Sequence, residues 1–235
     1  LTVEIDAHIA DYLAHKAEYA AMQFGSIPYT TTQNITYYID GVSGNDSNNG
    51  LTSSTAFKTW AKTESMIPLH CLHDVTIRII GNLNETISIS NRFCKSPNRI
   101  TVRGDTTTPS AHQINGISAC TCAGIRFQYL RINGPVLLSE GLNNDVRNCE
   151  PQKPGGVGIQ AQYGIYYITS NDFGNNVVED AIYAVNSRVF SANNIGNATQ
   201  YGLNATVAST IGKAGTQPTG SVANENITTG SVIRA

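Results

Sequence analysis

The sequence predicts an all-β fold in which short strands stack along one axis as a solenoid. From residue 74 onward, short apolar segments alternate with turn clusters rich in Asn and Gly, and no helical periodicity interrupts them. A small residue followed by an apolar strand recurs three times, at spacings of 17 and 21 residues. Two-residue hairpin turns are few, which disfavours the alternative of a β-sandwich or jelly roll.

The expected strands are short and follow one another closely. They cover residues 75–80, 86–89, 100–102, 125–130, 165–168, 182–185, 189–190 and 203–207, and Ile211. Between them lie the turn clusters Gly81-Asn82, Pro97-Asn98, Asn133-Gly134-Pro135, Gly141-Leu142-Asn143-Asn144, Gly174-Asn175-Asn176 and Asn193-Asn194. Ile and Val alternate with polar residues in the strands, so the apolar side chains are expected to point inward.

A distinct segment, residues 37–69, precedes the main solenoid. It opens with a strand at residues 37–39 and continues as a polar loop, Gly44-Asn45-Asp46-Ser47-Asn48-Asn49-Gly50, which cannot supply buried apolar surface. A helix is expected next, capped by Ser54 or Thr55 and ended by Pro68. The helix is predicted by residues that recur at helical spacing, namely Phe57, Trp60, Ala61, Glu64 and Ile67.

This segment resembles the entrance to a right-handed parallel β-helix. The pattern is a strand ending in Asp-Gly, then Gly-Asn-Asp-x-x-Asn-Gly-Leu, then Thr-Ala-Phe-Lys-Thr and a short helix. Phage tail spikes, phage tail fibres and pectate-lyase-like proteins carry it, with the helix lying across the open end. The resemblance implies that Phe57 and Trp60 cap the first coil, which has no neighbour beneath it. Alternatively, both are core residues of an α/β domain.

The two ends of the chain carry further segments. Residues 1–25 are predicted to form a helix, followed by a Thr-rich linker at 26–36. A heptad seam along this helix would make it a trimeric coiled-coil connector, and the alternative is a lone amphipathic helix. The seam consists of Ile5, His8, Tyr12, His15 and Tyr19. After the β-helix at 70–215, residues 216–235 resemble the closing segments of phage tail fibres and tail spikes.

The composition narrows the possible partners. The net charge is −2 and 14% of the 235 residues are charged, so neither nucleic acid nor a membrane surface is indicated as the main partner. No apolar run is long enough for a membrane helix, and no signal peptide is evident. The five cysteines lack the spacing of a disulfide framework and are interpreted as small buried residues in a reducing cytoplasm.

No cofactor and no metal ion are expected. The alternative is a metal site made from His70, Cys71, His73 and the Cys120-x-Cys122 pair, whose spacing is not that of a common zinc motif. The polar loop lacks the glutamate that completes an EF-hand, so it is interpreted as a structural turn, with a weak calcium site as the alternative.

No catalytic residue is assigned. Tail spikes of this shape often cleave bacterial polysaccharide with paired carboxylates, which a glycosidase holds about 5 to 10 Å apart. If the protein is an enzyme, the best pair is Asp172 with either Glu179 or Asp180, since adjacent acids in a strand point to opposite faces. The alternative is that all three are solvated turn residues.

Binding a glycan without cleaving it requires only aromatic faces and nearby amides or hydroxyls. The expected patch consists of Tyr163, Tyr166, Tyr167, Asn171 and Tyr183. Some of these tyrosines alternatively pack between the chains of a trimer.

Together, the sequence and the resemblance predict a phage tail-fibre or tail-spike subunit. It would be a homotrimer in the virion tail, assembled in the cytoplasm of the bacterial host, that attaches the particle to a bacterial surface glycan. Its N-terminal helix would join other tail or baseplate proteins. One alternative is a depolymerase of the same shape, and another is a purely structural virion component.

Overall fold

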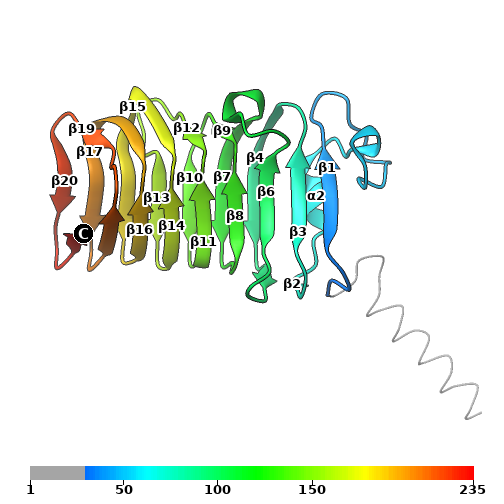
Figure 1. Ribbon diagram of the computed structural model, residues 1–235, viewed down its shortest axis with the longest axis horizontal. Coiled ribbons are helices and arrows are strands. Elements are labelled where there is room, and N and C mark those ends of the chain that lie inside the picture. The colour runs from blue at the N-terminus through cyan, green and yellow to red at the C-terminus, as the bar shows by residue number, and fades with distance from the viewer. Residues whose placement is uncertain (1–29) are drawn as a thin grey trace, which may run out of the picture.

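Residues 30–235 are described by a computed structural model, apart from the side chains of residues 175–177, and they form a parallel β-solenoid (Figure 1). Strands of successive coils lie side by side from β1 at one end to the C-terminal strands at the other. Every strand pairing in residues 30–235 is parallel. This arrangement excludes the antiparallel sandwich and confirms the predicted strand stack.

One face of the stack is a nine-stranded sheet, called sheet 1. Its strands in spatial order are β1 (Ile35–Ile39), β3 (Val75–Ile79), β6 (Ile100–Gly104), β8 (Ile125–Gln128), β11 (Leu142–Arg147), β14 (Ile165–Thr169), β16 (Arg188–Ala192), β18 (Thr210–Ala214) and β21 (Val232–Arg234). The order follows the chain, so each coil adds one strand to this face. Sheet 1 extends past residues 70–215 at both ends.

A second, ten-stranded sheet, called sheet 2, forms the other long face. It contains β4 (Leu83–Ser90), β7 (Gln113–Cys120), β9 (Arg131–Ile132), β10 (Val136–Ser139), β12 (Glu150–Pro151), β13 (Ile159–Gln162), β15 (Asp172–Val185), β17 (Ile195–Thr206), β19 (Thr219–Gly220) and β20 (Ala223–Ile227). A small sheet joins β2 (His70–Cys71) to β5 (Phe93–Cys94). The helical elements of the described residues are α2 (Trp60–Ser65) and two 3-10 turns, Ser53–Thr55 and Pro109–Ala111.

Each predicted strand segment overlaps an observed strand, but several strands were not predicted. The main omissions are β7, β10, β11 and β13. The cluster at residues 141–144, predicted as a turn, leads directly into β11, and Asn144 is a buried strand residue. The predicted helix at residues 1–25 and its seam (Ile5, His8, Tyr12, His15 and Tyr19) lie outside the described residues.

The core fills the space between the two sheets. Alternation within sheet 1 buries one side chain in two, so that Ile77, Val102 and Phe127 stack in register with no exposed surface. Tyr166 also lies in this core, and it fits because two neighbours lack side chains. A Cβ atom at Gly141 would lie 2.9 Å from the Tyr166 ring, and one at Gly164 would lie 2.5 Å from its hydroxyl oxygen.

Two columns of residues with positive φ form corners of the solenoid. Their φ angles lie between 44° and 60°, a region that Asn and Gly tolerate best. The first column connects sheet 2 to the next strand of sheet 1, and the second follows the strand of sheet 1. The first contains Thr121, Glu140, Tyr163, Asn186 and Val207, and the second contains Tyr129, Asn148, Ser170, Asn193 and Gly215. Single-residue corners of this kind account for part of the high Asn content.

Buried polar side chains satisfy the backbone where the strands bend. Asn171 Nδ2 donates to the Val146 carbonyl (3.0 Å), and Asn171 N donates to Asn194 Oδ1 of the next coil (2.9 Å). A serine ladder repeats at a spacing of 22 residues, in which Ser187 N donates to Ser209 Oγ (3.3 Å) and Ser209 N donates to Ser231 Oγ (3.1 Å). These ladders pair buried donors and acceptors between coils that apolar side chains would leave unpaired.

Helix α2 lies at the β1 end of the stack (Figure 1). Phe57 and Trp60 are buried within the continuous core, and Trp60 Nε1 donates to the Ser88 carbonyl in β4 (2.6 Å). The helix is capped by Thr59, whose side chain accepts from Lys62 N, and not by Ser54 or Thr55 as predicted. Those two residues instead form a separate 3-10 turn, because the chain is extended at Ala56 before the helix begins.

Candidate functional site

The predicted tyrosine patch is not a single surface. Tyr166 and Asn171 are fully buried, which removes both from a ligand-binding surface. The Tyr166 hydroxyl donates to the Gln162 carbonyl (2.6 Å) and accepts from Gly141 N (3.0 Å), and burial raises its pKa to about 12. A buried phenol whose donor and acceptor functions are both paired avoids the cost of an unsatisfied polar group in the core.

The other three tyrosines reach the surface, but on different faces. Tyr167 belongs to β14 of sheet 1, Tyr183 belongs to β15 of sheet 2, and Tyr163 is the corner residue between the two sheets. Tyr183 receives a hydrogen bond from Thr206 Oγ1 (3.3 Å) within sheet 2. Tyr163, which is 55% exposed, and Tyr167 lie on either side of Gly164 and Ile165 in the chain.

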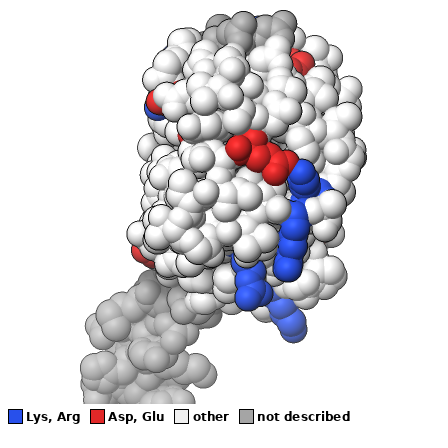
Figure 2. All heavy atoms as spheres, turned by 90° about the vertical axis from the view of Figure 1, so that its left-hand side faces the viewer, with Lys and Arg blue, Asp and Glu red and all other residues white. Residues whose placement is uncertain are grey.

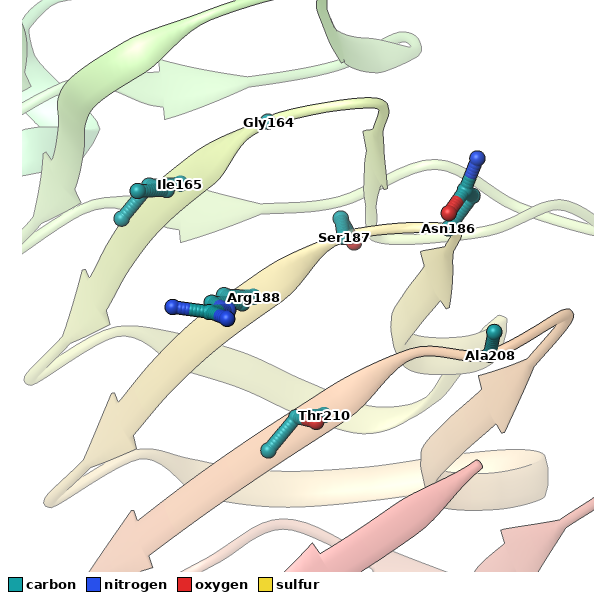
Figure 3. A pocket seen from close by; sticks show the side chains of 7 residues that line it. All are labelled: Gly164, Ile165, Asn186, Ser187, Arg188, Ala208 and Thr210. Atoms are coloured by element: carbon teal, nitrogen blue, oxygen red, sulfur yellow. The ribbon is translucent and has the colours of Figure 1, made fainter. Parts of the chain in front are cut away.

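A shallow depression of about 410 Å³ lies beside these two tyrosines. It is lined by Gly164, Ile165, Asn186, Ser187, Arg188, Ala208 and Thr210, from three successive coils (Figure 3). The figure shows Ile165, Arg188 and Thr210 projecting from neighbouring strands on one face, while Asn186 stands at the corner. Arg188 is exposed, and within the described residues its guanidinium makes no ion pair.

An aromatic pair extends the depression along the same strands. Tyr167 and Phe190 are register partners in β14 and β16, with ring centroids 6.1 Å apart and exposed fractions of 37% and 43%. Each stands two residues after a lining residue, Ile165 or Arg188, and therefore on the same outer face of sheet 1. We call the depression together with Tyr163, Tyr167 and Phe190 the sheet 1 site.

The sequence pattern did not predict Asn186, Arg188 and Phe190 as site residues. The predicted strand at 189–190 was too short to reveal which side chains alternate outward. Extended by one residue at its start, the same strand pattern puts Arg188 and Phe190 on one face and Val189 on the other, as the structure has them.

A second depression, of about 290 Å³, lies at the C-terminal end between β17, β18 and the final residues. Two of its charged lining residues, Lys213 and Glu225, form an ion pair with each other. Figure 2 views this end and shows acidic and basic atoms in contact on an otherwise largely uncharged surface. Because its charges are paired internally, this depression is a weaker candidate than the sheet 1 site.

The three acids proposed for catalysis have separate structural partners. Asp180 is buried, and its carboxylate accepts from Tyr201 N (3.2 Å) and Asn204 Nδ2 (2.9 Å) in the next coil. Burial raises the pKa of Asp180 above its ordinary value, against the effect of these two hydrogen bonds. The Asp180 carboxylate is thus used in hydrogen bonds between neighbouring strands of sheet 2.

Glu179 and Asp172 point elsewhere. Glu179 accepts from Gln200 Nε2 (2.7 Å), and Asp172 Oδ1 accepts from the backbone of Gly174 (2.8 Å), as in an Asx turn. Asp172 is exposed whereas Asp180 is buried, so those two acids do not present their carboxylates to one substrate. For Glu179, which is on the solvent side, the pairing with Asp172 stays a prediction.

The residues of the alternative metal site are not arranged as a set of metal ligands. Cys71 and Cys94 are register partners in the small sheet, and the His70 ring stacks on Phe93. In the described part of the chain, no group of three or more His, Cys, Asp or Glu side chains is arranged to hold a metal ion. All five cysteines are free thiols, and four of them are buried.

Within residues 30–235, no helix has the length and apolar character that crossing a bilayer requires. No family model and no curated protein sequence matches this chain.

Proposed function

We propose that this protein is a phage tail-fibre or tail-spike subunit that binds a bacterial surface glycan through the sheet 1 site. The glycan part of the proposal is supported by the site's chemistry. The virion part is supported by the resemblance of residues 37–67 to the entrance of the right-handed parallel β-helices in such proteins, and by the parallel solenoid that follows.

The observation that carries the proposal is the exposed aromatic pair beside a polar depression. Tyr167 and Phe190 offer apolar surface on which a sugar ring can pack, while Arg188, Asn186 and Thr210 offer hydrogen bonds to its hydroxyl groups. The site stands on the strands of a stacked sheet, so its side chains are held by a rigid support. A shallow, open site of this kind suits one face of a polymer better than a small molecule, which needs enclosure.

Binding is favoured over cleavage because of the carboxylates. Asp180 is committed to hydrogen bonds within sheet 2, and none of the residues lining the depression is an acid. A glycosidase needs two available carboxyl groups flanking the bond. We therefore propose an adhesin, and the depolymerase and the purely structural component become outcomes of the test.

The experiment uses the full chain with bacterial cells and purified surface glycans. We expect the protein to bind cells or glycan, and Phe190→Ala and Tyr167→Ala each to weaken binding about tenfold, a loss typical of an interface aromatic residue. Tyr183→Ala, which removes a tyrosine from sheet 2, serves as the matched control and leaves binding unchanged.

The same incubation separates the alternatives. If new reducing ends or unsaturated sugars form, the protein is a depolymerase and the adhesin proposal is wrong. Failure to bind any cell or glycan would leave only the structural component. If the sheet 1 and sheet 2 variants lose binding affinity equally, the sheet 1 site is not the binding surface.

The proposed assembly is a homotrimer joined through residues 1–25, with other tail or baseplate proteins bound to the same helix. The support is the heptad spacing of the seam residues, from Ile5 to Tyr19. Analytical ultracentrifugation of the full chain tests this. Three chains per particle are expected, and a monomer across the micromolar range would refute the trimer.

A further inference from the structure

The outer face of sheet 1 carries more positive than negative charge. Arg78 and Arg103 are register partners in β3 and β6, Arg126 and Arg147 follow in β8 and β11, and Arg188 follows in β16. These five arginines meet two carboxylates: Asp105 pairs with Arg78, and Asp145 is shared by Arg126 and Arg147. Arg103 and Arg188 make no ion pair within the described residues, and Arg126 and Arg147 have one carboxylate between them, so these residues carry a net excess of three positive charges.

These positive charges follow the solenoid axis. Arg103 lies over the Tyr129 ring at 5.1 Å, Arg126 and Arg147 share Asp145, and Arg188 lines the depression. Neighbouring strands are about 4.8 Å apart, so Arg126 and Arg188, three strands apart in sheet 1, are separated by roughly 14 Å along the axis. Tyr167 lies in β14, between the strands of Arg126 and Arg188, and Phe190 lies in β16, the strand of Arg188. Both belong to the register column that contains Arg126 and Asp145.

We infer that the glycan bound by the sheet 1 site is a linear, anionic polysaccharide that lies along the solenoid axis. The inference rests on the proposed glycan-binding function and specifies its substrate class. Charged groups on two sugars that flank a central ring meet Arg188 at one end and the Arg126–Arg147 pair at the other, while the aromatic pair packs against the central ring. Guanidinium groups suit this role because they bind carboxylate or sulfate oxygens with two parallel hydrogen bonds.

Two features favour an anionic glycan over nucleic acid. The chain as a whole has a net charge of −2, whereas nucleic-acid binders concentrate many cations against closely spaced phosphates. The two rings also pack against each other at an interplanar angle of 55°, which does not make the parallel platform on which successive bases stack.

The experiment measures binding of the full chain to matched polymers at low salt. Alginate is compared with carboxyl-reduced alginate, and dextran sulfate with dextran, so that each pair differs in charge and shares its sugar backbone. We expect at least one anionic polymer to bind about tenfold or more tightly than its neutral counterpart, and added salt to weaken it.

Two variants assign the effect to this face. Arg188→Gln is expected to lower the affinity for the anionic polymer about tenfold. Lys58→Gln makes the same change in net charge at an exposed position beside the β1 end, and is expected to change the affinity less than twofold. An equal loss in both variants would reduce the effect to the overall charge and overturn the inference.

The remaining outcomes are also decisive. If neutral and anionic polymers bind equally and Phe190→Ala weakens both, the adhesin proposal stands and the anionic specificity fails. If no polymer binds and no cells bind, the proposed function fails with it. If duplex DNA binds as tightly as the anionic polymers and Phe190→Ala has no effect, the face is a general polyanion surface and the inference is overturned.

Discussion

At the scale of single residues, Asp46 joins the polar loop to the capping helix. Its Oδ1 accepts from Lys58 N (2.8 Å) and Thr59 N (3.0 Å), and its Oδ2 accepts from Thr59 Oγ1 (2.8 Å). Partial burial alone would raise the pKa of Asp46, but the hydrogen bonds from Thr59 and Lys58 outweigh it and lower the pKa below its ordinary value. The loop that the sequence marks as a structural turn is thus tied to the start of α2.

Replacing this carboxylate tests its role. Asp46→Asn keeps the shape but weakens the acceptors, and we expect a loss of about 1–2 kcal/mol in the free energy of unfolding at pH 7. Because the pKa of Asp46 is lower in the folded than in the unfolded protein, its ionised carboxylate contributes fully to stability at pH values above the unfolded-state pKa. That contribution is progressively lost as the pH falls below about 4. Urea unfolding at pH 7 and pH 3 should therefore show a smaller difference between variant and wild type in acid. A difference independent of pH would contradict the ionic role.

Tyr166 gives a second test at this scale. Tyr166→Phe leaves the Gln162 carbonyl and Gly141 N without their partner, so we expect the free energy of unfolding to fall by about 1–2 kcal/mol. Tyr163→Phe removes an exposed hydroxyl from the first-column corner and is the matched control, with a change below about 0.5 kcal/mol. Equal stability of the two variants would contradict the buried role of the Tyr166 hydroxyl.

At the scale of elements, the corners decide how one strand turns into the next. Most positions of the two corner columns carry residues that can adopt a positive φ at moderate cost. Thr121 and Val207 are the exceptions, since a β-branched side chain at φ 51° or 52° is strained. Val207 is also 49% exposed, so little packing depends on its side chain. The corner at Val207 is therefore a place where the local sequence opposes the fold.

Relieving that strain should stabilise the protein. We expect Val207→Asn to raise the free energy of unfolding by about 1 kcal/mol, because Asn tolerates the left-handed region far better. Val222→Asn makes the same chemical change at a position that is 67% exposed and does not have a positive φ, and should give no gain. Thermal unfolding of both variants measures the difference, and a Val207→Asn variant no more stable than Val222→Asn would contradict the strain.

The residue pattern of each strand explains whether the sequence could predict it. Strands with alternating Ile and Val, such as β3 and β14, were predictable because their pattern reports burial directly. Strand β11 was hidden because Asn144 looks like a turn residue, yet its side chain accepts from Ile125 N and donates to Cys122 O inside the stack. Composition does not distinguish a loop asparagine from one that replaces a backbone hydrogen bond.

Tyrosine raised the same difficulty at the candidate site. Tyr166 and Tyr167 are neighbours with equal propensities, and alternation buries one and exposes the other. The sequence predicted that tyrosines gather near residues 163–183, but the choice of face required the register with β16. Alternation puts Arg188 and Phe190 on the outer face, and the register with β14 places them beside Ile165 and Tyr167.

At the scale of the whole molecule, the coils form a one-dimensional stack. Each coil contacts mainly the coils before and after it, because the parallel pairings join consecutive levels of each sheet. The repeat of 22 residues that links Ser187, Ser209 and Ser231 does not appear in the apolar pattern of the sequence, because its marker is a buried polar residue. The stability of such a stack depends on how its ends are covered. We therefore expect changes in α2 to have the largest effect on stability at the β1 end.

Trp60→Ala tests the cap. It removes a buried ring and the hydrogen bond to the Ser88 carbonyl, and is expected to lower the free energy of unfolding by about 3–5 kcal/mol. Trp60→Phe keeps most of the ring and loses chiefly the hydrogen bond, for about 1–2 kcal/mol. Because coupling passes from coil to coil, hydrogen exchange in Trp60→Ala should accelerate most in β1, β3 and β4 and least in β16 and β18. Uniform acceleration over residues 30–235 would instead make the stack a single cooperative unit, in which the cap stabilises distant coils as strongly as the coil it covers.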